Sequence, residues 1–255
     1  PLYSSAASDV YKRQNLASWQ EWDDDIKKRR PEAIELYRNE LSDEIEFWSF
    51  IQFLFFKQWN ELKSYANEKG IKIIGDMPIY VAEDSADVWS NPEAYLIYEE
   101  TLKPISIAGC PPDAFSETGQ LWGNPLYDWN YMEKTGYKWW IKRVEESLKI
   151  YDVVRIDHFR GFESYWEIPY GDTTAINGEW VKGPGIKLFN AIKESLGEIN
   201  VIAEDLGFLT NEVKEFLEET GFPGMKVLQF AFDEREESNL SLIHISEPTR
   251  RRGIS

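Results

Sequence analysis

Carboxylates recur at matching places along this chain, each directly after a short apolar run. Asp76 follows residues 71–75, Asp157 follows 153–156, and Glu204 follows 199–203. Arg155 lies two positions before Asp157, so on a strand both side chains point to the same face. A guanidinium beside a carboxylate favours its ionised form, which a nucleophile requires.

Two carboxyl groups in opposite protonation states can cleave a glycosidic bond with retention of configuration. One attacks as a carboxylate and the other protonates the leaving oxygen, with the two groups about 5–5.5 Å apart. Asp157 has the cationic neighbour, whereas Glu204 follows the apolar residues 201–203, where loss of solvent would raise its pKa. On this pattern alone a purely structural role stays open, with both carboxylates capping loops or pairing with surface lysines.

A parallel sheet would bring these carboxylates together. Helical patterns at 137–151, 185–196 and 211–220 separate the later apolar runs, and a fourth run spans 225–232. Thr210 is a candidate N-cap for the last of these helices. Continuous apolar strands joined by helices predict an α/β fold whose sheet is buried on both faces, with the strand ends meeting at one mouth.

The first part of the chain has a different pattern. Residues 17–69 are predicted to be helical, with Pro31 as a break or first turn and Gly70 as the terminator. The helical prediction rests on residues that recur at steps of three to five, roughly the period of a helix face: 36, 41, 45, 48, 52, 55, 59 and 62, all apolar except Gln52. Residues 77–136, rich in Pro, Gly, Asn and aromatics, are interpreted as a functional insertion over one end of the sheet.

The composition excludes several classes of function. A net charge of −17 argues against a nucleic-acid partner and is compatible with a neutral sugar polymer. No apolar run approaches the roughly 20 residues of a membrane span, so no membrane partner is expected. With Cys110 as the only cysteine, we expect a reducing compartment, the cytoplasm.

The sequence lacks the motifs of other kinds of catalytic site. His158 is the only histidine between the terminal segments, and no His/Cys cluster has the spacing of a zinc site. A Ser–His–Asp triad would lack its Gly-x-Ser-x-Gly turn, and no phosphate-binding Gly-x-x-x-x-Gly-Lys-Ser/Thr loop is present.

The terminal segments differ from the rest. Residues 4–14 (SSAASDVYKRQ) and 241–250 (SLIHISEPTR) resemble in-frame translations of paired sequencing adapters. Codons that can encode residues 9–14 have a reverse complement reading Leu-Ser-Leu-Ile-His-Ile, the string found at 240–245. We therefore interpret 1–14 and 241–255 as adapter-derived tails and 15–240 as a fragment of a catalytic domain, with disordered native tails as the alternative.

Several segments resemble the amylomaltase family, the 4-α-glucanotransferases or disproportionating enzymes of the α-amylase superfamily. They are 74–82 (IGDMPIYVA), 84–89 (DSADVW), 111–125 (PPDAFSETGQLWGNP), 155–162 (RIDHFRGF) and 202–207 (IAEDLG). The resemblance extends over about residues 19–233. It implies a (β/α)₈ barrel with insertions, of which this chain would hold about strands 3 to 6, with no metal and no cofactor.

The resemblance also implies roles for the residues at the strand ends. Asp157 would form the covalent glucosyl-enzyme and Glu204 would be the acid/base. Arg155 would hold the nucleophile, His158 would line the cleft, and Asp76 is a further candidate for substrate binding.

The loop 111–125 looks like the family's mobile loop on the acceptor side. There Asp113 and Glu117 would touch sugar hydroxyls, and Asn124 is another candidate contact. Trp122 would stack on a sugar ring, unless it only anchors the loop.

We therefore expect an enzyme that transfers 1,4-α-glucan segments between maltooligosaccharides, acting on starch- or glycogen-type glucans. The alternatives are an amylase-type hydrolase and a non-catalytic glucan-binding protein. The family's third essential carboxylate, in a Thr-His-Asp-Asn segment, has no counterpart before residue 240. We expect the 255-residue chain alone to be inactive and poorly soluble; its oligomeric state is left open.

Overall fold

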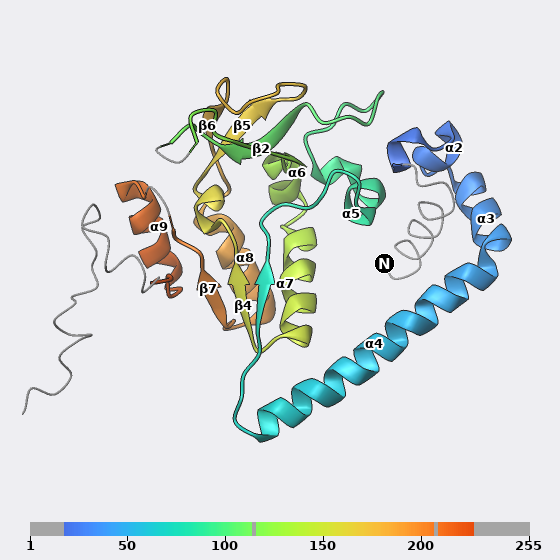
Figure 1. Ribbon diagram of the computed structural model, residues 1–255, viewed down its shortest axis with the longest axis horizontal. Helices are drawn as coiled ribbons and strands as arrows, with labels where there is room; N and C mark the ends of the chain where they lie inside the picture. The colour runs from blue at the N-terminus through green and yellow to red at the C-terminus, as the bar shows by residue number, and fades with distance from the viewer. Residues whose placement is uncertain (1–17, 114–115, 207–208, 227–255) are drawn as a thin grey trace, which may run out of the picture.

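A three-stranded parallel sheet lies at the centre of the molecule. The computed structural model describes residues 18–113, 116–206 and 209–226, so both predicted adapter-derived tails lie outside them. The sheet has the order β1-β4-β7, formed by β1 (Ile74–Met77), β4 (Val153–Ile156) and β7 (Val201–Ala203). This confirms the predicted mixed α/β fold with a parallel sheet (Figure 1).

Helices pack against this sheet where the sequence predicts them. They are α7 (Lys138–Ile150), α8 (Ile186–Leu196) and α9 (Asn211–Thr220). Thr210 caps α9, because its hydroxyl oxygen accepts a hydrogen bond from the Val213 N–H over 3.4 Å. Helix α7 packs against β1 and β4, and α8 lies between α7 and α9 in the same layer.

The first predicted strand is displaced along the chain. Strand β1 begins at Ile74 rather than at residue 71 and includes Asp76. The Asp152 carboxylate accepts the Ile73 N–H over 2.7 Å, and pairing with β4 starts only where Ile74 lies opposite Val153. Of the fourth predicted strand, 225–232, the first two residues are not in a strand and the others lie outside the described residues.

The prediction of a sheet buried on both faces is wrong for the described part of the chain. Side chains alternate between faces along a strand. Met77, Val154 and Ile156 are buried under the helices, whereas Ile74 on the other face is 59% exposed. Helices cover one face only, and the core lies between them and the sheet.

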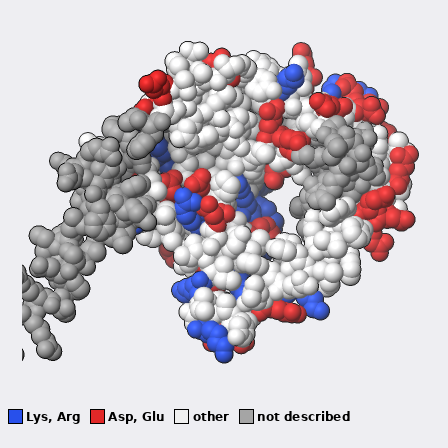
Figure 2. Space-filling model, in the orientation of Figure 1, with Lys and Arg blue, Asp and Glu red and all other residues white. Residues whose placement is uncertain are grey.

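The N-terminal region forms a helical arm (Figure 1). After a short 3-10 turn, η1 (Trp19–Glu21), come α2 (Asp24–Lys27), α3 (Pro31–Glu40) and α4 (Ser42–Glu68), with Pro31 in the first turn of α3. Figure 2 shows an opening between α4 and the body. Within the described residues, neither α4 nor another helix has the length and apolarity to cross a bilayer.

The face marked by helical spacing is only partly buried in this arm. Ile45 is buried, but Leu36, Phe55 and Leu62 are exposed. Near its end α4 contacts the body, where the Trp59 indole donates to the Ile150 carbonyl over 2.8 Å. Helical spacing identified one stripe of α4, but little of the described chain packs against it.

A second, antiparallel sheet lies over the carboxyl ends of the parallel strands (Figure 1). Its order is β3-β2-β5-β6, formed by β2 (Ser106–Cys110), β3 (Gln120–Pro125), β5 (Ser164–Pro169) and β6 (Glu179–Lys182). The short helices α5 (Ala86–Ser90), η2 (Pro92–Ala94), α6 (Trp129–Lys134) and η3 (Phe159–Phe162) complete the described elements. Residues 77–136 supply β2 and β3, while β5 and β6 are strands that the sequence did not predict.

Candidate active site

Backbone hydrogen bonds join the carboxyl ends of the three parallel strands. The Asp157 N–H donates to the Met77 carbonyl over 3.0 Å, and the Glu204 N–H donates to the Ile156 carbonyl over 3.0 Å. The Phe159 N–H donates to the Glu204 carbonyl over 3.1 Å. The strand ends therefore meet at one edge, as predicted for a parallel sheet.

Arg155 links two carboxylates at this edge. The register of β1 and β4 places it opposite Asp76, whose Oδ1 lies 2.6 Å from Nη1. Its Nη2 lies 2.9 Å from Oδ1 of Asp157. Burial would lower the pKa of Arg155, but its hydrogen bond to Asp76 and the charges of Asp76, Asp157 and Glu204 outweigh that effect, so the pKa is raised. The Asp157 side chain is 44% exposed, which leaves it accessible to a substrate.

Glu204 has a contrasting environment on the neighbouring strand end. Its Oε2 accepts the His158 N–H over 2.9 Å, and its Oε1 accepts the Leu206 N–H over 2.8 Å. Burial is the largest influence and raises the pKa of Glu204, and the charge of Asp157 adds to this. The two N–H donors and Arg155 oppose it, yet the net pKa stays above the usual value. Glu204 is therefore suited to carry a proton.

His158 directly follows Asp157 in the sequence and contacts Glu204 through its backbone N–H. Its backbone is left-handed, with φ of 51°, an uncommon conformation. Burial, with the charge of Arg160 adding, lowers the pKa of His158 from 6.5 to about 4. The imidazole is thus neutral near pH 7. Gly161 lies close by, where an added Cβ would come within 3.1 Å of His158 Cδ2.

Strand β3 brings an aromatic side chain to this cluster. The Trp122 ring packs against the His158 ring with an interplanar angle of 89° and centroids 4.8 Å apart. It also contacts the Tyr80 ring, with centroids 6.2 Å apart. Asn124 on the same strand donates its side-chain N–H to the Val81 carbonyl over 2.8 Å. Trp122 therefore joins the site, while the Asn124 amide holds β3 to the segment after β1.

The other predicted loop residues lie at the surface. Asp113 and Glu117 are both exposed. Oδ1 of Asp113 accepts the Ser116 N–H over 2.8 Å, closing a local turn. Their contacts with sugar hydroxyls stay a prediction.

One neighbour of Arg155 was not predicted from the residues. Nε of Arg155 lies 3.1 Å from Sδ of Met225, which is 70 residues away in the chain. A methionine after a helix is ordinarily assigned to the core, so no pattern in the residues predicts this contact.

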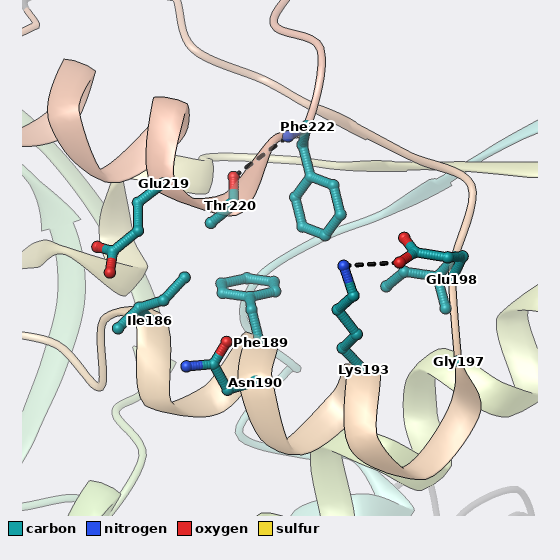
Figure 3. A pocket seen from close by; sticks show the side chains of 10 residues that line it. Ile186, Phe189, Asn190, Lys193, Gly197, Glu198, Glu219, Thr220 and Phe222 are labelled. Carbon is teal, nitrogen blue, oxygen red and sulfur yellow. Dashed lines mark hydrogen bonds and ion pairs between the residues drawn. The ribbon is translucent and has the colours of Figure 1, made fainter.

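Two further features help to delimit the site. Among residues 18–113, 116–206 and 209–226, no three His, Cys, Asp or Glu side chains gather as a metal site would require. A pocket of about 90 Å³ lies away from the strand ends, between α8 and α9, where Lys193 and Glu198 pair over 2.6 Å (Figure 3). Its volume is below the ~300 Å³ at which ligand pockets begin.

Paired carboxylates at the carboxyl ends of parallel strands are an arrangement found in enzymes that act on glycosidic bonds. The sequence pattern of the family described as 4-alpha-glucanotransferase matches residues 3–249. The chain belongs to this family.

Individual relatives agree with this assignment. The chain is 60% identical over 230 residues to a 4-alpha-glucanotransferase of Clostridium butyricum, covering 90% of this chain and 47% of the relative. It is 63% identical over 225 residues to a 4-alpha-glucanotransferase of Streptococcus pneumoniae, covering 88% of this chain and 44% of that relative. An amylomaltase from Streptococcus agalactiae, solved in complex with acarbose, superposes with a TM-score of 0.90 at 45% identity, covering 95% of this chain and 49% of that one. The chain thus spans about half the length of the curated relatives it matches.

Proposed function

We propose that Asp157 and Glu204 are the nucleophile and the acid/base of a retaining 4-α-glucanotransferase, and that β1, β4 and β7 belong to a (β/α)₈ barrel. The observation that carries the proposal is the contrast between two carboxyl groups on neighbouring strand ends. Asp157 pairs with the Arg155 guanidinium over 2.9 Å, whereas burial raises the pKa of Glu204. Retaining glycosyl transfer needs this division between an ionised and a protonated carboxyl.

In the first step the donor glucan is cut. An Asp157 oxygen attacks the anomeric carbon and forms a covalent glycosyl ester, while the bond from that carbon to the glycosidic oxygen breaks. Glu204 gives its proton to that oxygen, so the leaving glucan departs with a free 4-hydroxyl. Arg155 pairs with the Asp157 carboxylate and orients it for the attack.

In the second step a second glucan accepts the glycosyl group. Glu204, now a carboxylate, takes the proton of the acceptor's 4-hydroxyl. The acceptor oxygen attacks the anomeric carbon and the ester bond to Asp157 breaks. Two inversions give net retention, and both carboxyl groups return to their starting states.

Transfer requires that water does not take the intermediate. Trp122 packs on His158, which adjoins Asp157, so we propose that β3 and its loop shield the ester from water until an acceptor binds. Maltooligosaccharides and starch- or glycogen-type glucans are the proposed substrates.

The test uses a composite enzyme, because the chain spans about half of its relatives. In it, residues 18–226 of this chain replace the matching segment of the Clostridium butyricum relative. The composite enzyme is incubated with maltotriose and its products are separated by length. Glucose together with longer maltooligosaccharides supports transfer. Only shorter sugars with rising reducing ends would indicate the rival, a hydrolase.

Matched variants separate catalysis from binding alone. Asp157→Asn and Glu204→Gln each remove one carboxylate in the composite enzyme, and both should abolish transfer. Asp172→Asn and Glu145→Gln make the same changes on the outer surface and should leave transfer intact. A glucan-binding protein without catalysis would form no product in any of these variants while still binding maltooligosaccharide.

A further inference from the structure

The Arg155 guanidinium is engaged on all three nitrogens by three different residues. Nη1 contacts Asp76 and Nη2 contacts Asp157, while Nε donates to the Met225 thioether over 3.1 Å. A planar guanidinium held at three corners has little freedom to rotate. The orientation of Nη2 toward Asp157 therefore depends partly on where Met225 lies.

Asp205 fixes the backbone that carries Met225. Its Oδ1 accepts the Met225 N–H over 2.6 Å. At Gly224, an added Cβ would lie 2.3 Å from Oδ2 of the same carboxylate, so only glycine allows this approach. The Ala203 N–H donates to the Pro223 carbonyl over 2.9 Å, which holds the segment beside the end of β7.

We propose that Asp205 and Met225 are positioning residues that hold Arg155 in the orientation in which it pairs with Asp157. This rests on the proposed function of Asp157 as the nucleophile. A thioether is a neutral and weak acceptor. It occupies Nε without adding a third carboxylate that would compete with Asp157 for the positive charge of the guanidinium.

The first experiment observes Arg155 directly in the composite enzyme, by a signal that does not depend on whether the enzyme transfers glucan. The Nε–H signal of Arg155 in a ¹H–¹⁵N spectrum is assigned by its loss in Arg155→Lys. In Met225→Leu and in Asp205→Ala this signal should shift, and its exchange with solvent should accelerate by about tenfold or more, because Nε loses its acceptor. An unchanged signal in both variants would overturn the proposal.

The controls make equivalent changes elsewhere. Met132→Leu alters a buried methionine of the core. Asp152→Ala removes a carboxylate that accepts the Ile73 N–H at the opposite end of the same strands. Neither should move the Arg155 signal, and a shift of equal size in these controls would also count against the proposal.

The second experiment measures kinetics in the composite enzyme. Asp205→Ala should lower kcat by about 10- to 100-fold with KM nearly unchanged, because a misplaced catalytic group affects the reaction step more than substrate binding. Asp205→Asn should restore most of kcat, since the amide oxygen can accept the same N–H. Equal impairment of the Asn and Ala variants would contradict the proposal. If the composite enzyme transferred no glucan, the proposed function would fail while the spectroscopic result would stand on its own.

Discussion

The backbone N–H of His158 donates a 2.9 Å hydrogen bond to Oε2 of Glu204. Asp157 is the residue before His158. This bond therefore connects the Glu204 carboxyl to the peptide group that directly follows Asp157. The His158 backbone has a left-handed φ of 51°, whose cost the surrounding packing must offset. The Glu204 carboxyl is thus held by two backbone N–H groups, those of His158 and Leu206.

Replacing Glu204 by Gln should slow the reaction of each donor substrate to an extent that depends on its leaving group. Transfer from maltotriose should fall by about 10²- to 10⁴-fold, because its leaving oxygen needs a proton. The first release of fluoride from α-maltosyl fluoride should fall much less, since fluoride leaves without a proton. Because the pKa of Glu204 is raised, wild-type activity on maltotriose should decline as pH rises through that pKa. Initial rates in the composite enzyme test this, and equal losses on both donors would exclude Glu204 as the acid.

His158 should make the stability of the chain depend on pH. Its pKa falls from 6.5 to about 4 on folding, so between these values the unfolded chain binds a proton that the folded chain does not. The free energy of unfolding should therefore rise with pH across this window, and the His158 contribution should be complete above pH 6.5. Urea unfolding of wild type and His158→Gln tests this. The variant should show the shallower dependence, and parallel curves would refute a depressed His158 pKa.

Trp122 should control the partition between transfer and hydrolysis. In the composite enzyme, Trp122→Ala should lower the ratio of transfer to hydrolysis by about tenfold, because water gains access to the intermediate. Trp122→Phe keeps a ring against His158 and should retain most of that ratio. Trp180→Ala removes an exposed tryptophan of β6 and serves as the control. An unchanged ratio in Trp122→Ala would show that this ring only packs the loop.

Arg143 should stabilise the segment that follows β1. Its guanidinium donates to the carbonyls of Ile79 over 2.9 Å and Pro78 over 2.6 Å, and to the Tyr127 hydroxyl over 3.0 Å. Arg143→Ala should lower the free energy of unfolding by about 2–4 kcal/mol, because charge-assisted hydrogen bonds are lost together. Lys142→Ala, on the exposed side of α7, should change it by less than about 0.5 kcal/mol. Urea unfolding compares the two, and equal small effects would contradict this role.

Local patterns predicted the elements that carry the site. Apolar runs, helical spacing and the Thr210 cap gave β4, α7, α8 and α9 close to their observed bounds. The spacing of Arg155 and Asp157 predicted their contact, because two residues on one strand determine it.

Features that depend on distant partners were missed. The start of β1 is set by pairing with β4 and by Asp152, neither of which is visible in residues 71–75. The Met225 contact with Arg155 joins segments 70 residues apart. The exposed apolar stripe of α4 follows helical spacing correctly, but spacing does not say what a face packs against.

The most direct test of Asp157 is to trap the covalent intermediate. Glu204→Gln slows the second step, so a fluorinated glucosyl fluoride should leave the composite enzyme glycosylated. Proteolysis and mass spectrometry then locate the sugar. We expect one glycosyl group on the peptide with Val153–Ile156, attached to the Asp157 carboxylate. A sugar attached to another carboxylate, or turnover with inverted product and no attachment, would contradict it.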